Sequence, residues 1–344
     1  MTKVDLITGF LGSGKTTFIR KYVEYLLDKG ENVCILENDY GAINVDMMLL
    51  SDLEEKGCGL EMVAGGCDYD CHRRRFKTKL ITMAMLGYDK VIVEPSGIFD
   101  VDEFFDILHE EPLDRLYEIG NVITIVKANL EKNLSDEADF MLASQIAQAG
   151  CMVLSHVKEA SKDEVEETVD HINHALKKVK CNRRFNYIKA VSEDFQDGVM
   201  VSKDSIYKKD APTDLLIKEW DLLTHEDFQH IENSGYKKES YEKKFSMDDN
   251  SFDALFFMNI DMSMEDIKKT IADLFHDDSI GKIMRVKGFT ESDGKWYELN
   301  ATSKGIDIKE IPNGQNVIIV IGEKPDKKII DGYFRARYST IKTE

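Results

Sequence analysis

Short β-branched apolar runs alternate with helical stretches over the first 200 residues of the chain. Runs rich in Val and Ile are typical of buried strands, and apolar residues spaced three and four apart are typical of helices. The alternation therefore predicts a parallel sheet covered by helices. The predicted strands are Val4–Thr8, Asn32–Asn38, Lys90–Glu94, Asn121–Val126, Met152–Ser155 and Arg184–Ala190.

Two of the intervening helices have clear sequence signals. A helix over Thr16–Asp28 is followed by Lys29-Gly30, and glycine is common just past the end of a helix. A helix over Asp163–Lys178 has an apolar stripe at Val165, Val169, Ile172 and Leu176.

This alternation stops near residue 200. Charged and polar residues dominate from 201 to 250, which predicts an inter-domain linker with a helix at Asp214–Leu223. A second pattern of strands and helices follows from Phe252, with a hairpin around Ser292-Asp293-Gly294. We therefore predict an α/β domain in residues 1–200, a linker in 201–250 and a small α+β domain with an antiparallel sheet in 251–344. In that domain the predicted elements are strands at Ala254–Ile260, Gly281–Thr290, Lys295–Ala301 and Asn316–Gly322 and helices at Met264–Phe275 and Lys327–Arg335.

The segment after the first predicted strand reads G-F-L-G-S-G-K-T-T, a complete G-x-x-x-x-G-K-[ST] phosphate-binding loop. Its glycines let backbone N–H groups converge on phosphate oxygens, and the following helix directs its positive end toward them. Lys15 can reach the β- and γ-phosphates, and the Thr16 hydroxyl can bind Mg²⁺. The predicted phosphate-binding residues of this loop are Gly9, Gly12, Ser13, Gly14, Lys15, Thr16 and Thr17.

A second candidate nucleotide motif is Val91-Ile-Val-Glu94-Pro-Ser-Gly97, an apolar strand that ends in a carboxylate and then a glycine. A carboxylate at this place can hold the Mg²⁺ shell or orient a water molecule. Gly97 leaves room for its N–H to approach the γ-phosphate. A strand followed by a plain Pro-Gly turn is the alternative, and the intact phosphate loop upstream favours the functional interpretation.

Two cysteines lie between these motifs, in Ala64-Gly-Gly-Cys67-Asp-Tyr-Asp-Cys71-His72. If a helix begins at Cys67 and runs to Leu86, the two thiols share one face and can share a metal ion. Two ligands are too few for a zinc site, so others must converge on it. The candidates for these further ligands are Glu37, Asp39, Asp70 and His72. Two ordinary cysteines at a helix start are the alternative. Cys58 is a less favoured ligand, because the strand-like Leu60–Ala64 separates it from Cys67.

Composition excludes several classes of protein. The net charge of −19 argues against a nucleic-acid partner. No apolar run is long enough to cross a membrane, and no secretory leader is visible, so we expect a cytoplasmic protein. Six cysteines without secretory features favour reduced thiols or metal ligands over disulfides.

These motifs resemble those of the CobW-type (COG0523) P-loop GTPases. Glu37-Asn38-Asp39-Tyr40-Gly41 through Asp46 is similar to the family's switch segment, and Glu94-x-x-Gly97 is similar to its acid-x-x-glycine motif. Gly281–Phe289 with Trp296 is similar to the core of its C-terminal domain. The resemblance implies a P-loop GTPase fold and nucleotide-driven delivery of a metal, variously zinc, cobalt or iron, to a client protein.

The chain departs from the family pattern at two places. The family's metal motif is C-x-C-C, whereas here Tyr69 and Asp70 follow Cys67 and the second thiol, Cys71, lies one position late. The family's base-reading motif is N-K-x-D, whereas this chain has Ser155-His156-Val157-Lys158. GTP is therefore implied by the resemblance and not by these residues, and ATP stays open.

The leading hypothesis is a slow Mg²⁺-dependent GTPase that acts as a metallochaperone for zinc or cobalt. Lys15 and the loop amides hold the phosphates, Thr16 binds Mg²⁺, and Glu94 supports the Mg²⁺ or positions water. Glu37 or Asp39 senses the γ-phosphate, and Cys67 and Cys71, with Glu37 and Asp70, hold the cargo metal. The alternatives are a nucleotide-regulated activator of a partner enzyme without metal cargo and, less favoured, a small-molecule kinase. The oligomeric state is open, with a homodimer among the assemblies considered.

Overall fold

The computed structural model describes residues 1–39, 45–64, 69–97, 99, 101–186, 195–196, 199–200, 214–243, 252–312 and 314–340. The chain forms two compact units, Met1–Ser246 and Met247–Glu344. Each unit has its own sheet and its own apolar core.

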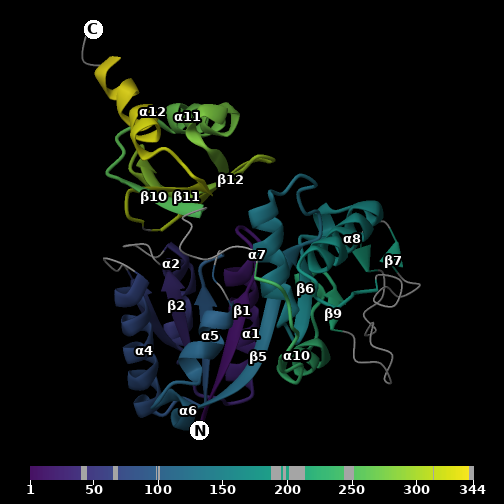
Figure 1. Ribbon diagram of the computed structural model, residues 1–344. Coiled ribbons are helices and arrows are strands. Elements are labelled where there is room, and N and C mark those ends of the chain that lie inside the picture. The colour runs from purple at the N-terminus through teal and green to yellow at the C-terminus, as the bar shows by residue number, and fades with distance from the viewer. Residues whose placement is uncertain are drawn as a thin grey trace. The chain divides into compact units, whose positions relative to one another are not determined.

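The first unit is built on a seven-stranded parallel sheet with the order β3-β2-β4-β1-β5-β6-β9 (Figure 1). Because the strands are parallel, their carboxyl ends share one edge, which we call the carboxyl edge. The strands are β1 (Thr2–Thr8), β2 (Val33–Asp39), β3 (Gly59–Ala64), β4 (Lys90–Pro95), β5 (Tyr117–Lys127), β6 (Cys151–Ser155) and β9 (Leu215–Ile217). A separate short hairpin pairs β7 (Phe195–Gln196) with β8 (Val199–Met200).

Helices cover both faces of this sheet (Figure 1). One face is covered by α1 (Lys15–Asp28), α2 (Val45–Leu50), α3 (Asp52–Glu55) and α10 (His225–Glu232). The other face is covered by α4 (Tyr69–Leu86), α5 (Val101–Leu108), α6 (Leu113–Leu116), α7 (Asp136–Ala147) and α8 (Lys162–Lys178).

The strands are apolar on both faces, as expected for a parallel sheet between two helical layers. In β5, Ile123 and Ile125 pack on the α1 side, whereas Val122 and Val126 pack on the opposite side. Successive side chains of a strand point to opposite faces, so each strand contributes to both cores. The predicted α/β fold with a helix-covered parallel sheet is confirmed.

The predicted linker is wrong for residues 214–243. The sixth strand was expected at Arg184–Ala190, but residues 184–186 form no strand and residues 187–190 lie outside the described part. The position beside β6 is taken instead by β9, where a helix was predicted. Three strand residues are too short a run for a sequence pattern to reveal.

Residues 214–243 are held in the first unit by buried polar groups as well as apolar ones. Lys218, with no exposed side-chain area, donates a hydrogen bond of 2.6 Å to Asp227, which is 1% exposed. Asp227 also completes a capping box with Thr224 at the start of α10. Phe228 and Ile231 then pack into the core on the α1 side.

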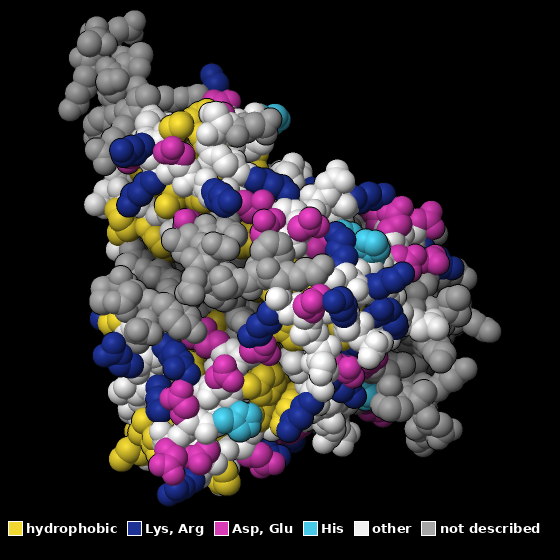
Figure 2. Space-filling model, viewed as in Figure 1, with side chains coloured by type: hydrophobic (Ala, Val, Ile, Leu, Met, Phe, Trp, Pro, Cys, Tyr) yellow, Lys and Arg dark blue, Asp and Glu magenta, His cyan; other side chains and the backbone are white. Residues whose placement is uncertain are grey.

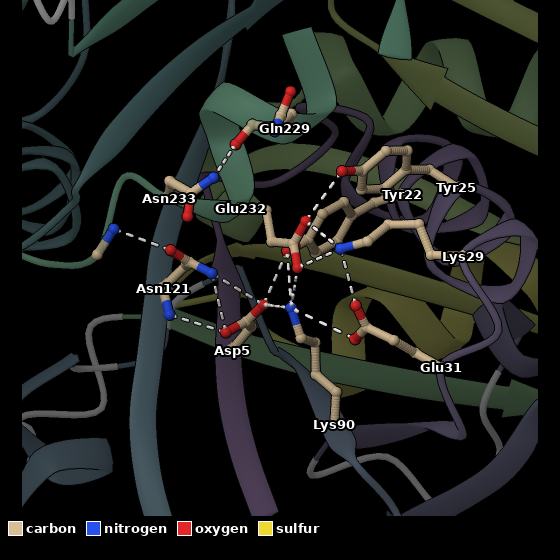
Figure 3. Close-up of polar contacts among 11 residues, drawn as sticks. Asp5, Tyr22, Tyr25, Lys29, Glu31, Lys90, Asn121, Gln229, Glu232 and Asn233 are labelled. Atoms are coloured by element: carbon tan, nitrogen blue, oxygen red, sulfur yellow. Dashed lines mark hydrogen bonds and ion pairs between the residues drawn. The ribbon is translucent and has the colours of Figure 1, made fainter. Parts of the chain in front are cut away.

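A polar cluster joins α10 to the sheet and to the end of α1 (Figure 3). It consists of Asp5, Tyr22, Tyr25, Lys29, Glu31, Lys90, Asn121 and Glu232. Lys90, 3% exposed, lies 3.4 Å from Asp5 and 3.5 Å from Glu232. Asp5 accepts from Asn121 at a register shift in β5, where the backbone of Gly120 and Asn121 leaves the regular ladder.

The second unit is an antiparallel sheet with the order β10-β14-β11-β12-β13, packed with two helices. Asp293 and Gly294 turn the predicted hairpin with φ values of 53° and 75°. The α+β prediction is confirmed, and Gly305–Ile311 is a strand that the sequence analysis did not predict. Its elements are β10 (Phe252–Met258), α11 (Met264–His276), β11 (Lys282–Ser292), β12 (Lys295–Thr302), β13 (Gly305–Ile311), β14 (Val317–Glu323) and α12 (Lys327–Thr340).

On the face shown in Figure 2, acidic and basic side chains are interspersed across the described surface. Among the described residues, no helix is long and apolar enough to cross a membrane.

Candidate nucleotide and metal site

The loop between β1 and α1 has the backbone conformation that a phosphate cradle needs. Gly9, Gly12 and Gly14 have φ values of 149°, 70° and 89°. Side chains other than glycine rarely adopt these values. A Cβ atom on Gly9 would also lie only 2.2 Å from the carbonyl oxygen of Ile125, so the loop lies directly against β5.

Lys15, the first residue of α1, folds back over this loop. Its ammonium group donates a 3.1 Å hydrogen bond to the carbonyl oxygen of Gly9, and the residue is 8% exposed. The hydroxyl of Ser13 is buried without a hydrogen-bond partner among the described residues. A loop lined by N–H groups, one ammonium and one hydroxyl is a donor set that suits a phosphate chain.

Thr16 and Glu94 lie next to each other at the carboxyl edge. The Thr16 hydroxyl donates to Oε1 of Glu94 at 3.1 Å, although the two residues are 78 positions apart in the chain. Glu94 is 4% exposed. A hydroxyl beside a carboxylate is an arrangement of oxygen ligands that can bind Mg²⁺ directly or through its water molecules.

Gly97 approaches the phosphate loop closely. A Cβ atom at this position would lie 2.9 Å from the backbone nitrogen of Leu11. Only glycine therefore lets the turn after β4 lie against the loop. Gln145 of α7, which the sequence analysis did not single out, holds this turn by donating to the carbonyl oxygen of Gly97 at 3.0 Å.

The strand β2 connects this edge to the cysteine segment. Glu37 pairs in register with Glu94 of β4, and Ser96 N donates to the carbonyl oxygen of Asn38 at 3.0 Å. The side chain of Asn38 is 2.7 Å from Nε2 of His72, and both residues are buried. The start of α4 is thus linked to the strand that ends beside Glu94.

The predicted metal ligands are only partly described. The described part of helix α4 starts at Tyr69, so the predicted helical spacing of Cys67 and Cys71 stays a prediction. Cys67 lies outside the described residues, and Asp39 and Asp70 are described by their backbone alone. Within these limits Glu37 is buried on β2 and Cys71 is half-buried on α4. In the described ranges, no group of three or more His, Cys, Asp or Glu side chains is arranged so that it could hold a metal ion.

Four other cysteines, Cys34, Cys58, Cys151 and Cys181, belong to the cores. Burial raises the pKa of Cys34, Cys58 and Cys151 to about 12. A thiol that stays protonated is a poor metal ligand and a poor nucleophile.

The segment that replaces N-K-x-D is well described. Ser155, the last residue of β6, is fully buried and donates to the carbonyl oxygen of Val126. Lys158, 71% exposed, forms an ion pair of 3.4 Å with Glu219, 18% exposed, in the segment after β9. The lysine at the fourth motif position is therefore paired with a carboxylate from the segment that follows the neighbouring strand.

Trp220 is a site residue that the sequence analysis missed. Its ring would be 2.7 Å from a Cβ atom on Gly14, and it packs edge-on against Phe18 with centroids 6.2 Å apart. A tryptophan three residues beyond a strand as short as β9 has no pattern that marks it in advance.

Comparison with known proteins places these observations in a family context. Residues 3–185 match the model of the CobW/HypB/UreG nucleotide-binding domain. The matched residues make up more than half of the chain.

Among curated relatives, the zinc chaperone YeiR of Escherichia coli is 31% identical over 141 residues, covering 40% of this chain and 42% of that protein. The zinc chaperone YjiA of the same organism is 26% identical over 183 residues, covering 49% and 54%. The zinc-regulated GTPase metalloprotein activator 1 of Schizosaccharomyces pombe is 25% identical over 186 residues, covering 52% and 43%. The chain thus spans about half the length of these relatives.

Among solved structures, zinc-bound YjiA GTPase from Escherichia coli aligns with 97% of this chain and 98% of its own at 14% identity. The TM-score is 0.35, which is too low to support any argument about the site.

Proposed function

The chain belongs to the CobW/HypB/UreG nucleotide-binding family, and on this premise we propose that it is a Mg²⁺-dependent GTPase that carries zinc to a client protein. The observation that supports the proposal best is a continuous connection at the carboxyl edge. It runs from Thr16 through Glu94 to β2, and from Asn38 to His72 beside Cys71. Phosphate hydrolysis and metal binding would then both affect the carboxyl end of β2.

In this proposal the phosphate loop binds the nucleotide and Lys15 exchanges its bond with Gly9 for one with phosphate oxygen. Thr16 binds Mg²⁺ through its hydroxyl. Glu94 holds the Mg²⁺ shell or orients the attacking water, and the N–H of Gly97 faces the γ-phosphate. Glu37 or Asp39 reports the presence of that phosphate. We expect hydrolysis to be slow, with Glu94 as the group that orients the attacking water.

Zinc is the proposed cargo because of the ligand types and the relatives. Cys67 and Cys71 offer thiolates, with Glu37 and Asp70 as the remaining ligands, and mixed sulfur and oxygen or nitrogen sets suit Zn²⁺. Three relatives are named as zinc chaperones or as a zinc-regulated GTPase. Cobalt accepts a similar tetrahedral set and is the runner-up. The client is a metalloprotein or partner enzyme, and we expect the protein to act in the cytoplasm.

The cargo proposal is tested by titrating full-length protein with Zn²⁺ and with Co²⁺ in the presence of GDP. We expect one ion to bind per chain, with Co²⁺ giving the absorption of a tetrahedral thiolate site. The double variant Cys67→Ser/Cys71→Ser should lose this binding, whereas the buried-core variant Cys151→Ser should keep it.

Binding that is unchanged in Cys67→Ser/Cys71→Ser would contradict the cargo role. If the chain nevertheless binds and hydrolyses GTP, the nucleotide-regulated activator without metal cargo becomes the better account. Pull-down of partners with GDP and with a non-hydrolysable GTP analogue would then identify the client directly.

A further inference from the structure

The nucleotide base must extend to one particular side of the phosphate loop. Thr16 and Glu94 place the Mg²⁺ side toward β4 and β2. The sheet order places β5, β6 and β9 on the other side of β1. Ligands of open parallel sheets lie across the carboxyl edge near the strand where the order reverses, so the nucleoside faces the ends of β6 and β9.

Two segments meet at this position. The first follows β6 and contains Lys158, and the second follows β9 and contains Glu219 and Trp220. Trp220 packs over Gly14 of the phosphate loop, so the segment that follows β9 reaches this loop. The 3.4 Å ion pair between Lys158 and Glu219 joins the two segments.

We infer that the carboxylate of Glu219 reads the base of the bound nucleotide, in place of the carboxylate that is missing at position 158. The inference rests on the proposed nucleotide-binding function. Guanine presents two donors on one edge, the N1–H and the exocyclic amino group, and a carboxylate can accept from both. Adenine has no such pair of donors there, so Glu219 would select guanine.

The partial burial of Glu219 makes its carboxylate effective. With 18% of its side chain exposed, it is shielded from bulk water, and its hydrogen bonds to a base are charge-assisted. Lys158 is 71% exposed and can move into solvent when the base arrives, because an ion pair with such an exposed partner is weak. In the nucleotide-free protein, Lys158 is therefore paired with the carboxylate of Glu219, and guanine replaces Lys158 when the nucleotide binds.

The test is competition against fluorescent mant-GDP bound to the full-length protein, with GDP, IDP, ADP and XDP as competitors. IDP lacks the exocyclic amino group, and XDP has a carbonyl oxygen in its place. Wild-type protein should bind GDP more tightly than IDP and far more tightly than ADP. Glu219→Gln should weaken the binding of GDP by about 10- to 100-fold. It should also raise the affinity for XDP relative to that for GDP, because an amide can donate to the carbonyl oxygen of XDP.

Two further variants keep the test decisive. Asp221→Asn, on the same segment and 82% exposed, should leave the order of competitors unchanged. Lys158→Ala should keep the preference for GDP, since it frees the carboxylate, and this variant does not depend on folding of the Glu219 variant. Thermal unfolding of each variant confirms that it is folded.

The outcomes separate the two claims. A wild-type protein that binds mant-GDP but prefers ADP, or a Glu219→Gln variant that keeps the wild-type order, overturns the role of Glu219 and leaves nucleotide binding intact. A loss of GDP preference in Lys158→Ala would also overturn it, because Lys158 would then be the base contact. A wild-type protein that binds neither mant-GDP nor mant-ADP overturns the proposed function itself.

Discussion

At the residue scale, Thr16 and Glu94 bear most directly on phosphate chemistry. Thr16 lies on the first turn of α1 and Glu94 lies near the end of β4, and their hydroxyl and carboxylate meet at 3.1 Å. Replacing a carboxylate by its amide keeps the shape of the side chain and removes its charge.

We expect Glu94→Gln to lower the rate of GTP hydrolysis by about a hundredfold, the loss typical of one electrostatic group in an active site. Nucleotide binding should fall much less, because the phosphate loop is intact. Single-turnover hydrolysis and equilibrium binding measure the two effects separately. Glu61→Gln, on β3 and paired with Lys79, is the matched control. Equal hydrolysis rates in wild type and Glu94→Gln would exclude the assigned role.

The thiols differ enough to be told apart chemically. Burial raises the pKa of Cys34, Cys58 and Cys151 to about 12, so these thiols stay almost entirely protonated at pH 8. Cys71 is half-buried on the first turn of α4.

In native protein at pH 8, iodoacetamide should therefore modify Cys71 much faster than Cys34, Cys58 and Cys151, as read by peptide mass spectrometry. Stoichiometric Zn²⁺ should slow the modification of Cys71 if it is a ligand. Fast labelling of Cys58 in native protein would show that the core opens more readily than its burial indicates.

At the element scale, α10 is tied to α1 and the sheet by the polar cluster. Burial alone would raise the pKa of Glu232. Hydrogen bonds from Lys29 and Tyr25, and the charges of Lys90 and Lys29, outweigh burial and lower it below its ordinary value of 4.5. The folded state thus binds the Glu232 proton more weakly than the unfolded state does. The resulting stability is present above pH 4.5 and is lost as the pH falls through the lowered pKa.

We expect Glu232→Gln to lower the free energy of unfolding at pH 7 by about 2 kcal/mol, because Lys29 and the buried Lys90 lose a charged partner. The difference from wild type should shrink as the pH is lowered below 4. Urea unfolding between pH 3 and pH 7 measures it. Glu226→Gln, exposed on the same helix, should change stability by only a few tenths of a kcal/mol. A Glu232→Gln effect that does not depend on pH would contradict the ionic explanation.

How far the elements followed from the sequence depended on their length and on their local signals. The strand before the phosphate loop and the helix after it have a long apolar run and a capped amphipathic stripe, and both were predicted closely. Strand β9 has three residues and is stabilised by tertiary contacts, among them the Lys218–Asp227 pair. Long-range contacts such as Asn38 to His72 and Lys158 to Glu219 depend on strand order, which periodicity does not encode.

At the scale of the whole molecule, the corrected boundary makes a prediction about truncation. A chain of residues 1–246 should fold and bind nucleotide, because the phosphate loop, Glu94 and Glu219 all lie in the first unit. A chain of residues 1–200 lacks β9 and α10 and exposes apolar surface on both faces of the sheet, so it should aggregate or unfold. Circular dichroism and mant-GDP binding measure both. A chain of residues 1–200 that is stable and binds nucleotide would support the prediction that residues 201–250 are a linker.

The central claim is that nucleotide state and metal binding are coupled through the end of β2. If a bound nucleotide changes the affinity of the protein for zinc, thermodynamic linkage requires that bound zinc changes the affinity for that nucleotide by the same factor. The series of contacts from Thr16 and Glu94 through β2 to His72 is short. We therefore expect a coupling free energy between nucleotide and zinc within the range usual for allosteric proteins.

The most direct test is calorimetric titration of full-length protein with Zn²⁺, once with GDP and once with a non-hydrolysable GTP analogue, both with Mg²⁺. We expect the Kd for Zn²⁺ to differ by about tenfold or more between the two nucleotides, and this difference should disappear in His72→Ala. The same Kd in both nucleotide states would contradict it.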